Sequence, residues 1–313
     1  MKSIKVMSPS SVANLSCGYD ILGICLDHVG DEMIITKTNS PGLSITNIKG
    51  AKLSYSVDKN VAGIAAKSYL SNNPSKFGFE IEIIKKVTVG SGLGSSASSA
   101  VAAVYGIDYL LERNSNKIDL IKHAVDGEQF ASGEAHADNI APTMFGGLTL
   151  VRDLKTLDIL NLPFPKDLFI TILHPEIELK TSILRNVLNK KISIKKVVKQ
   201  TANLGGLISG LYSNDYQLIS RCLVDEIVEE RRASSIPGFY SLKESAIQNG
   251  ALGCGISGSG PSIFSISKGK KTASSVKKGF EKVYSQKNIS FKTFISKINY
   301  EGVKVFEQWF TIV

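Results

Sequence analysis

Val89-Gly90-Ser91-Gly92-Leu93-Gly94-Ser95-Ser96-Ala97 is the most informative segment of this chain. Three glycines alternate over five positions, and small and apolar residues continue from the two serines to Leu111. The β-rich segment Phe79 to Ile84 comes just before, so the order predicts a strand, a glycine loop and a helix. Glycine lets backbone N–H groups approach an anion, and the helix adds unpaired N–H groups and its dipole. We therefore expect the loop to bind a phosphate.

The loop differs from two common nucleotide-binding patterns. It lacks the lysine of the GxxxxGK[ST] motif, and its spacing is GxGxG where the dinucleotide fingerprint needs GxGxxG. A lone glycine cluster would favour a tight turn that lets a helix lie close to a sheet. The serines favour phosphate instead: Ser95 or Ser96 is predicted to cap the helix, and the Ser96 hydroxyl is short enough to reach a Mg²⁺ ion on the phosphates.

Composition bounds the class of protein. The chain has 313 residues, 43% hydrophobic and 21% charged, which predicts a soluble globular protein of one large or two ordinary domains. The net charge is +9, and much of the excess lies in the stretches 190–199 and 268–278. Such stretches can attract nucleic acid, but these lysines are not interleaved with aromatic residues. A solvated surface is therefore favoured, with no nucleic-acid partner.

Cysteine and hydropathy patterns point to the cytoplasm. No pair of the four cysteines has CxxC spacing, and the four histidines add no metal-ligand spacing, so we expect no disulfide framework. An alternating strand begins at residue 4, and no apolar run approaches about 18 residues, so neither a signal peptide nor a membrane span is expected.

The chain alternates strand and helix signals in an α+β pattern. A looser stretch near Asp153, followed by Pro163 and Pro165, predicts a boundary between domains at 1–155 and 156–313. Strands are predicted at 4–6, 32–36, 43–46, 79–84, 146–151, 168–173, 262–266 and, as the last element, 291–295; helices are predicted at 60–70, from 95 onward, and at 118–130, 193–212, 216–230, 239–249 and 272–284.

The glycine loop resembles the ATP-binding loop of the GHMP kinase superfamily. The segments 8–23 (SPSSVANLSCGYDILG) and 255–262 (GISGSGPS) also resemble that superfamily, in its order and spacing. The details are most similar to the homoserine kinase family, and the resemblance covers essentially the whole chain. It implies a two-domain GHMP kinase fold, with an N-terminal α/β domain that carries the phosphate-binding loop and a ferredoxin-like C-terminal domain.

The first matching segment contains Asn14 and Asp20 on either side of a turn. Asn and Asp are common turn formers, so the pair alone would indicate only a turn. The resemblance implies that both contact the amino-acid substrate, where a carboxylate can pair with an α-ammonium group. The family pattern has phenylalanine where this chain has Tyr19, a change that removes no polar contact.

Two further polar groups follow the loop helix. Glu128 alone would be read as an exposed helical carboxylate, but the resemblance makes it a Mg²⁺ ligand together with Ser96. The segment 136–139 (HADN) matches the family in full and implies that His136, Asp138 and Asn139 contact substrate. Asn139 stands where mevalonate kinase has a catalytic Asp, and an amide cannot act as a general base.

The C-terminal half supplies the remaining candidates. Thr181 and Arg185 lie one helical turn apart, and Arg232 ends an EERR motif in which Arg231 is a potential substitute. Each arginine alone would be read as part of a surface ion pair, whereas the family binds substrate with arginine at both places. The resemblance also assigns Gly258 to the substrate site and Asn60 to the adenine side of the ATP site.

Together these matches imply phosphorylation of the side-chain hydroxyl of L-homoserine by ATP and Mg²⁺, giving O-phospho-L-homoserine for threonine biosynthesis. The resemblance also implies that Asn139, Ser96 and Glu128 form the catalytic set and that the protein is a homodimer. Two alternatives stay open. One is another GHMP small-molecule kinase, and the other is a non-catalytic nucleotide- or RNA-binding protein of the same fold.

Overall fold

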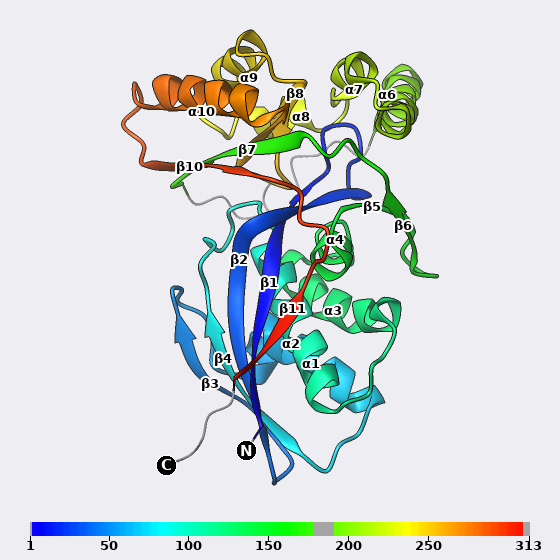
Figure 1. Cartoon of the computed structure of the whole chain (residues 1–313), viewed down its shortest axis with the longest axis vertical. Helices are drawn as coiled ribbons and strands as arrows, with labels where there is room; N and C mark the ends of the chain where they lie inside the picture. Colours follow the sequence, from blue (N-terminus) through cyan, green and yellow to red (C-terminus); the bar gives the residue numbers. More distant parts are fainter. Residues whose placement is uncertain (1, 178–190, 309–313) are drawn as a thin grey trace.

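The described part of the chain forms two β-sheets, one above the other in Figure 1, each covered by helices on one face. The computed structural model describes residues 2–177 and 191–308. The first sheet has the strand order β11-β1-β2-β4-β3, with β5 paired to β2 and β6 to β5; only β3 and β4 run parallel. Its strands are β1 (Ser3–Ala13), β2 (Leu22–Thr38), β3 (Leu43–Lys49), β4 (Gly78–Ile84), β5 (Leu148–Asp153), β6 (Asp158–Leu162) and β11 (Lys304–Gln308).

Helix α2 forms the centre of the first layer. It is buried along most of its length because its side chains are small, and Ala100 and Val104 belong to the same core as Ile4 and Ile35 of the sheet. Dense contact of this kind holds the start of α2 rigidly under the glycine loop. The helices of this layer are α1 (Val61–Asn72), α2 (Ser95–Leu110), α3 (Lys117–Ser132) and α4 (Ile140–Phe145).

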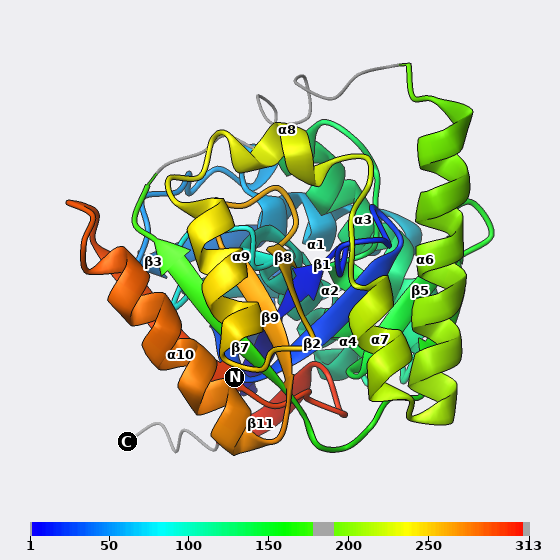
Figure 2. The same cartoon turned by 90° about the horizontal axis from the view of Figure 1, so that it is seen from above.

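The second sheet is antiparallel with the order β10-β7-β9-β8. Its chain order of strand, helices, two strands, helix and strand is that of a ferredoxin-like unit, which confirms the expected fold. In Figure 2, α9 and α10 lie across this sheet, and α6 and α7 stand beside it. The elements are β7 (Leu168–Pro175), α6 (Ile194–Ser213), α7 (Tyr216–Cys222), α8 (Glu229–Ala233), α9 (Phe239–Gln248), β8 (Gly253–Ile256), β9 (Ile263–Lys268), α10 (Lys270–Tyr284) and β10 (Phe291–Ser296).

Two predicted elements differ from the structure. The helix expected over 216–230 is split into α7 and α8, because the carboxylate of Asp225 accepts hydrogen bonds from the N–H groups of residues 227, 228 and 229. The strand expected to be last, β10, is followed by β11, which returns to pair with β1 of the first sheet. The division at residue 155 stays a prediction; β6 and β11, which come later in the chain, both belong to the first sheet.

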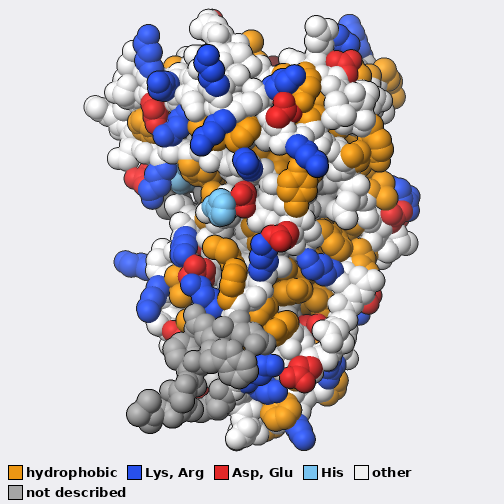
Figure 3. All heavy atoms as spheres, viewed as in Figure 1, with side chains coloured by type: hydrophobic (Ala, Val, Ile, Leu, Met, Phe, Trp, Pro, Cys, Tyr) orange, Lys and Arg blue, Asp and Glu red, His pale blue; other side chains and the backbone are white. Residues whose placement is uncertain are grey.

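Charge is dispersed over the face of the molecule that Figure 3 shows. On the face shown in Figure 3, lysine and arginine side chains are scattered among acidic and apolar ones. Within 2–177 and 191–308, no helix is both long enough and apolar enough to cross a membrane.

Candidate active site

Loops from both sheets meet around one cavity. Among the predicted site residues, those that line it are Asn14, Asp20, Val89, Gly90, Ser91, Gly92, Gly94, Ser95, Ser96, Glu128, His136, Asp138, Asn139, Arg232 and Gly258. The residues come from six separate segments of the chain, so only the folded state brings them together. Thr181 and Arg185 lie outside the described residues, so their predicted contacts stay predictions.

The glycine loop needs its glycines for conformation and for close contact. Gly92 has φ of 79°, and a Cβ there would lie 2.5 Å from the carbonyl oxygen of Ser257. The hydroxyl of Ser257 donates a hydrogen bond of 2.7 Å to the carbonyl of Gly92. The second glycine-rich segment therefore supports the glycine loop from the other sheet.

The start of α2 differs from the predicted serine cap. The N-cap residue is Gly94, with φ of 65°, and it makes no side-chain cap hydrogen bond. The hydroxyl of Ser95 instead donates to the carbonyl of Val87 at 3.3 Å. The prediction of a serine cap was wrong because Ser95 is already the first residue of the helix. Ser95 and Ser96 still line the cavity at the positive end of the helix dipole.

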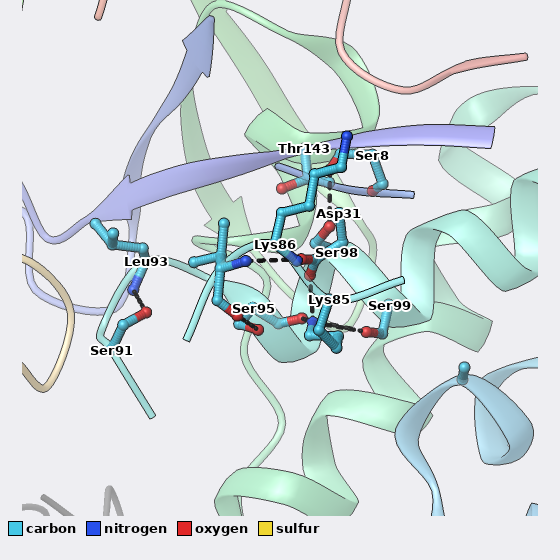
Figure 4. Close-up of polar contacts among 12 residues, drawn as sticks. Ser8, Asp31, Lys85, Lys86, Ser91, Leu93, Ser95, Ser98, Ser99 and Thr143 are labelled. Carbon is cyan, nitrogen blue, oxygen red and sulfur yellow. Dashed lines mark hydrogen bonds and ion pairs between the residues drawn. The ribbon is translucent and has the colours of Figure 1, made fainter. Parts of the chain in front are cut away.

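Sequence reasoning missed Lys85, which also lines the cavity. Figure 4 shows it among its partners Asp31, Ser95 and Ser99. Its buried ammonium group pairs with the carboxylate of Asp31 and donates to the Ser95 carbonyl at 2.7 Å and the Ser99 hydroxyl at 3.0 Å. Burial lowers the pKa of Lys85, and the negative charge of Asp31 opposes that shift. The only sequence signal was a lysine between the end of a strand and the glycine loop.

Asp31 ties the other side of this ion pair to the loop. Its carboxylate accepts hydrogen bonds from the backbone N–H groups of Lys86, at 2.8 Å, and Val87, at 3.1 Å. The pair therefore joins β2, the entrance of the glycine loop and the first turn of α2.

The turn after β1 is held in a strained conformation. Asn14 and Asp20 have φ of 74° and 59°, in the left-handed region that non-glycine residues seldom occupy. The amide of Asn14 donates to the carbonyl of Gly258 at 2.9 Å and accepts from the N–H of Asp20 at 3.1 Å. This one side chain thus fixes the turn against the second glycine-rich segment. Strain of this kind is found at binding sites.

Arg232 and Arg231 face different spaces. Arg232 is buried, donates from Nη1 to the Gly258 carbonyl at 2.7 Å, and has its guanidinium carbon 5.2 Å from the ring centre of Tyr19. Arg231 lines a separate cavity together with Tyr19 and Cys17. The geometry therefore favours Arg232 as the arginine of the candidate active site.

The HADN segment closes the cavity at the start of α4. His136 and Asp138 are both buried, with 3.8 Å between Nδ1 and Oδ1. Asn139 occupies the N-cap position of α4, and its Oδ1 accepts a hydrogen bond of 2.9 Å from the Ser11 hydroxyl.

The donors available to a metal suit Mg²⁺. Ser96 and Glu128 both line the cavity and offer hard oxygen atoms, and the Glu128 side chain is buried. Among the described residues, no group of three or more His, Cys, Asp or Glu could hold a metal ion. Mg²⁺ commonly takes one or two protein ligands and fills the other positions with phosphate oxygens and water. The residues present therefore fit a Mg²⁺ ion that arrives with a nucleotide.

Two predicted nucleotide residues lie outside the cavity lining. Asn60 caps α1: its amide accepts from the N–H of Ala62 at 3.0 Å and donates to the Ser54 carbonyl at 2.8 Å. Leu93 is buried, and its carbonyl accepts from the N–H of Ser11 at 3.2 Å. The adenine-side role of Asn60 stays a prediction, while Leu53, which the sequence did not suggest, lines the cavity.

Two family models match the chain in the segments that build this site. The model described as the GHMP kinases N terminal domain matches residues 59–147, and the model described as GHMP kinases C terminal matches residues 207–286. The fold and the cavity thus define a kinase of the GHMP family.

Similar proteins identify the family within the GHMP kinases to which the chain belongs. It is 39% identical to a homoserine kinase of Chlorobium phaeobacteroides over 97% of this chain and 100% of that protein, and 37% identical to one of Methanococcus vannielii over 91% and 94%. A solved homoserine kinase structure from Cytophaga hutchinsonii is 44% identical, with a TM-score of 0.95 and 98% coverage of both chains. A galactokinase structure from Lactococcus lactis, 15% identical with a TM-score of 0.67, covers 96% of this chain and 95% of that one and shows the shared fold alone. The chain belongs to the homoserine kinase family.

Proposed function

We propose that this protein transfers the γ-phosphoryl group of ATP to the side-chain hydroxyl of L-homoserine and forms O-phospho-L-homoserine for threonine biosynthesis. One observation carries the proposal: a single cavity joins a glycine loop at a helix N-terminus to a turn with a carboxylate, Asp20, and a buried arginine, Arg232. The relatives named homoserine kinase, which cover 91% to 98% of this chain, support the same activity.

The nucleotide end of the cavity is the glycine loop. Its backbone N–H groups and the start of α2 provide positive electrostatic potential for the phosphates of ATP. Ser96 and Glu128 would hold Mg²⁺, which neutralises charge on the phosphates when it is bound. Phosphoryl transfer depends mainly on positioning and charge stabilisation, so this arrangement suits the reaction.

The amino-acid end would recognise a zwitterion. Asp20 would pair with the α-ammonium group, and the planar guanidinium of Arg232 would bind the α-carboxylate. Asn14 would hold the turn that carries Asp20, since its Oδ1 accepts a hydrogen bond from the N–H of Asp20. The Gly258 carbonyl would hold the loop beside this turn, because it accepts hydrogen bonds from Asn14 and Arg232. Sugars and isoprenoid alcohols lack the α-amino-carboxylate that this end of the cavity would bind: galactose has neither charged group, and mevalonate has a carboxylate but no ammonium group.

The attacking hydroxyl would lose its proton without a carboxylate base at position 139. Asn139 cannot accept that proton at neutral pH, so the proton would pass to the phosphate or to water. His136 and Asp138 would contact the substrate beside it. We also propose that the enzyme acts in the cytoplasm and that it is a homodimer. Light scattering on the purified protein would test the oligomeric state.

A substrate panel tests the proposal. ADP release would be measured with ATP and Mg²⁺ in the presence of homoserine, homoserine lactone, mevalonate or galactose. We expect turnover with homoserine, loss of turnover with EDTA, and no turnover with the lactone, because ring closure consumes both the hydroxyl to be phosphorylated and the carboxylate. Preference for mevalonate or galactose would assign the chain another GHMP kinase activity. Salt-dependent RNA binding without ATP turnover would support the non-catalytic alternative.

A further inference from the structure

The contact between Ser11 and Asn139 sets the direction of a side chain at the reacting centre. We propose that Ser11 is a positioning residue that turns Oδ1 of Asn139 toward β1 and its Nδ2 toward the cavity, where the amide donates a hydrogen bond to a phosphate oxygen of ATP. This inference rests on the proposed kinase function. Asn139, which cannot act as a general base, would then act as a hydrogen-bond donor.

Ser11 is well placed to control this amide. It lies on β1 at an irregularity in the pairing with β2, between Pro9 and Ser11, and such a bulge redirects side chains. Its side chain is fully buried, and its hydroxyl lies 2.9 Å from Oδ1 of Asn139 and 3.3 Å from the Asn139 carbonyl oxygen. A buried hydroxyl needs a hydrogen-bond partner, so the contact is stabilising.

The glycine loop leaves room for this contact. A Cβ on Gly94 would lie 2.4 Å from the Ser11 hydroxyl and 2.8 Å from Oδ1 of Asn139. The N–H of Ser11 also donates to the carbonyl of Leu93 at 3.2 Å. Strand β1, the phosphate loop and the start of α4 therefore converge on the oxygen end of the amide.

Charge favours this orientation over its reverse. With the amide turned round, Ser11 would accept from Nδ2 and donate to the Asn139 carbonyl, and Oδ1 would face the cavity. A carbonyl oxygen beside a triphosphate is repelled, whereas an N–H group is attracted. The cavity also contains the carboxylates of Asp138 and Glu128, which increases the need for a donor at this point.

Kinetics of matched serine variants test the proposal. Ser11→Ala should lower kcat with homoserine by about three- to tenfold, the equivalent of one hydrogen bond, with both KM values nearly unchanged. Ser11→Thr keeps the hydroxyl and should restore most of the rate. Ser10→Ala removes the hydroxyl of an adjacent, equally buried serine and should change nothing. An unchanged kcat in Ser11→Ala, with an active wild type, would overturn the proposal.

An NMR measurement covers the case in which Ser11→Ala does not fold. The side-chain NH₂ signals of Asn139, assigned by their loss in Asn139→Asp, should shift in the wild-type protein when ADP with Mg²⁺ and a phosphate analogue is added. Absence of any shift in protein that binds ADP would overturn the proposal. A wild type that binds ADP but does not phosphorylate homoserine would refute the proposed function. In that case the NMR shift of the Asn139 side-chain NH₂ signals would still test the proposed orientation of the amide.

Discussion

Replacing Asp31 with asparagine should destabilise the fold beneath the phosphate loop. The exposed fractions of the Lys85 and Asp31 side chains are only 2% and 4%. An asparagine at position 31 could still accept both backbone hydrogen bonds, because both go to Oδ1 of Asp31. Its NH₂ group would replace the Oδ2 atom that pairs with Lys85, so the buried ammonium group would lose its paired counter-charge. Removing one partner of a buried ion pair costs about 3–5 kcal/mol, because the other charge stays in a medium of low polarity.

The neighbouring ion pair provides a matched control. Lys86 follows Lys85 and pairs with Glu32, which follows Asp31, but 50% of the Lys86 side chain is exposed. Exposed pairs contribute about 0–1 kcal/mol, so Lys86→Met should change the free energy of unfolding by no more than that. Lys86→Met also leaves Glu32 with a second partner, Lys5 at 2.8 Å, whereas Asp31→Asn leaves a buried ammonium group that has lost its paired carboxylate.

Urea unfolding followed by far-UV circular dichroism would measure both variants, with the free energy extrapolated to water. The double variant Asp31→Asn with Lys85→Met should lose less than the sum of its single variants, because no unpaired charge remains. The ATP KM of Asp31→Asn should also rise, since Lys85 holds the Ser95 carbonyl. A loss in Asp31→Asn no greater than in Lys86→Met would refute the reasoning.

Three other predictions concern separate parts of the molecule. Burial lowers the pKa of His174, with a smaller effect from a nearby lysine, so the contribution of His174 to stability is complete above the unfolded pKa of about 6.5 and is lost as pH falls toward the folded pKa. Unfolding free energies measured from pH 5 to 7 should therefore vary less in His174→Gln than in the wild type, and equal pH dependence in the two proteins would contradict this prediction. Gly92→Ala should lower Tm more than Gly133→Ala. Gly133 also has positive φ, but no atom lies within 4 Å of an added Cβ there, so Gly133→Ala should cost only the conformational term of about 1–2 kcal/mol. Similar Tm values for the two variants would show that the second glycine-rich segment moves at little cost to accommodate a Cβ at position 92. Arg232→Lys should raise the homoserine KM far more than the ATP KM, and Arg231→Lys should leave both near wild type; the opposite pattern would move the carboxylate site to Arg231.

Local patterns were sufficient for most of the elements. The helix from Ser95 and the strands at 79–84 and 168–173 have strong periodicity, and the structure contains all three. The helix expected over 216–230 was wrong because a side-chain interaction, that of Asp225, interrupts a segment whose residues suit a helix. Strands β6 and β11 were missed because short strands have weak local signals and depend on partners distant in sequence.

The glycine loop at the start of a helix was predictable from residues alone because the strand signal, the glycine spacing and the helix signal follow one another in a short stretch of the chain. Which arginine enters the cavity, and that Lys85 belongs to the site at all, became clear only in three dimensions. Arg231 and Arg232 are adjacent and chemically identical, so only the direction imposed by α8 separates them. Lys85 and Lys86 are likewise indistinguishable by type, and burial against Asp31 and the first turn of α2 gives the former its role. Chemical type and spacing are local properties, whereas burial and direction depend on contacts between segments far apart in the chain.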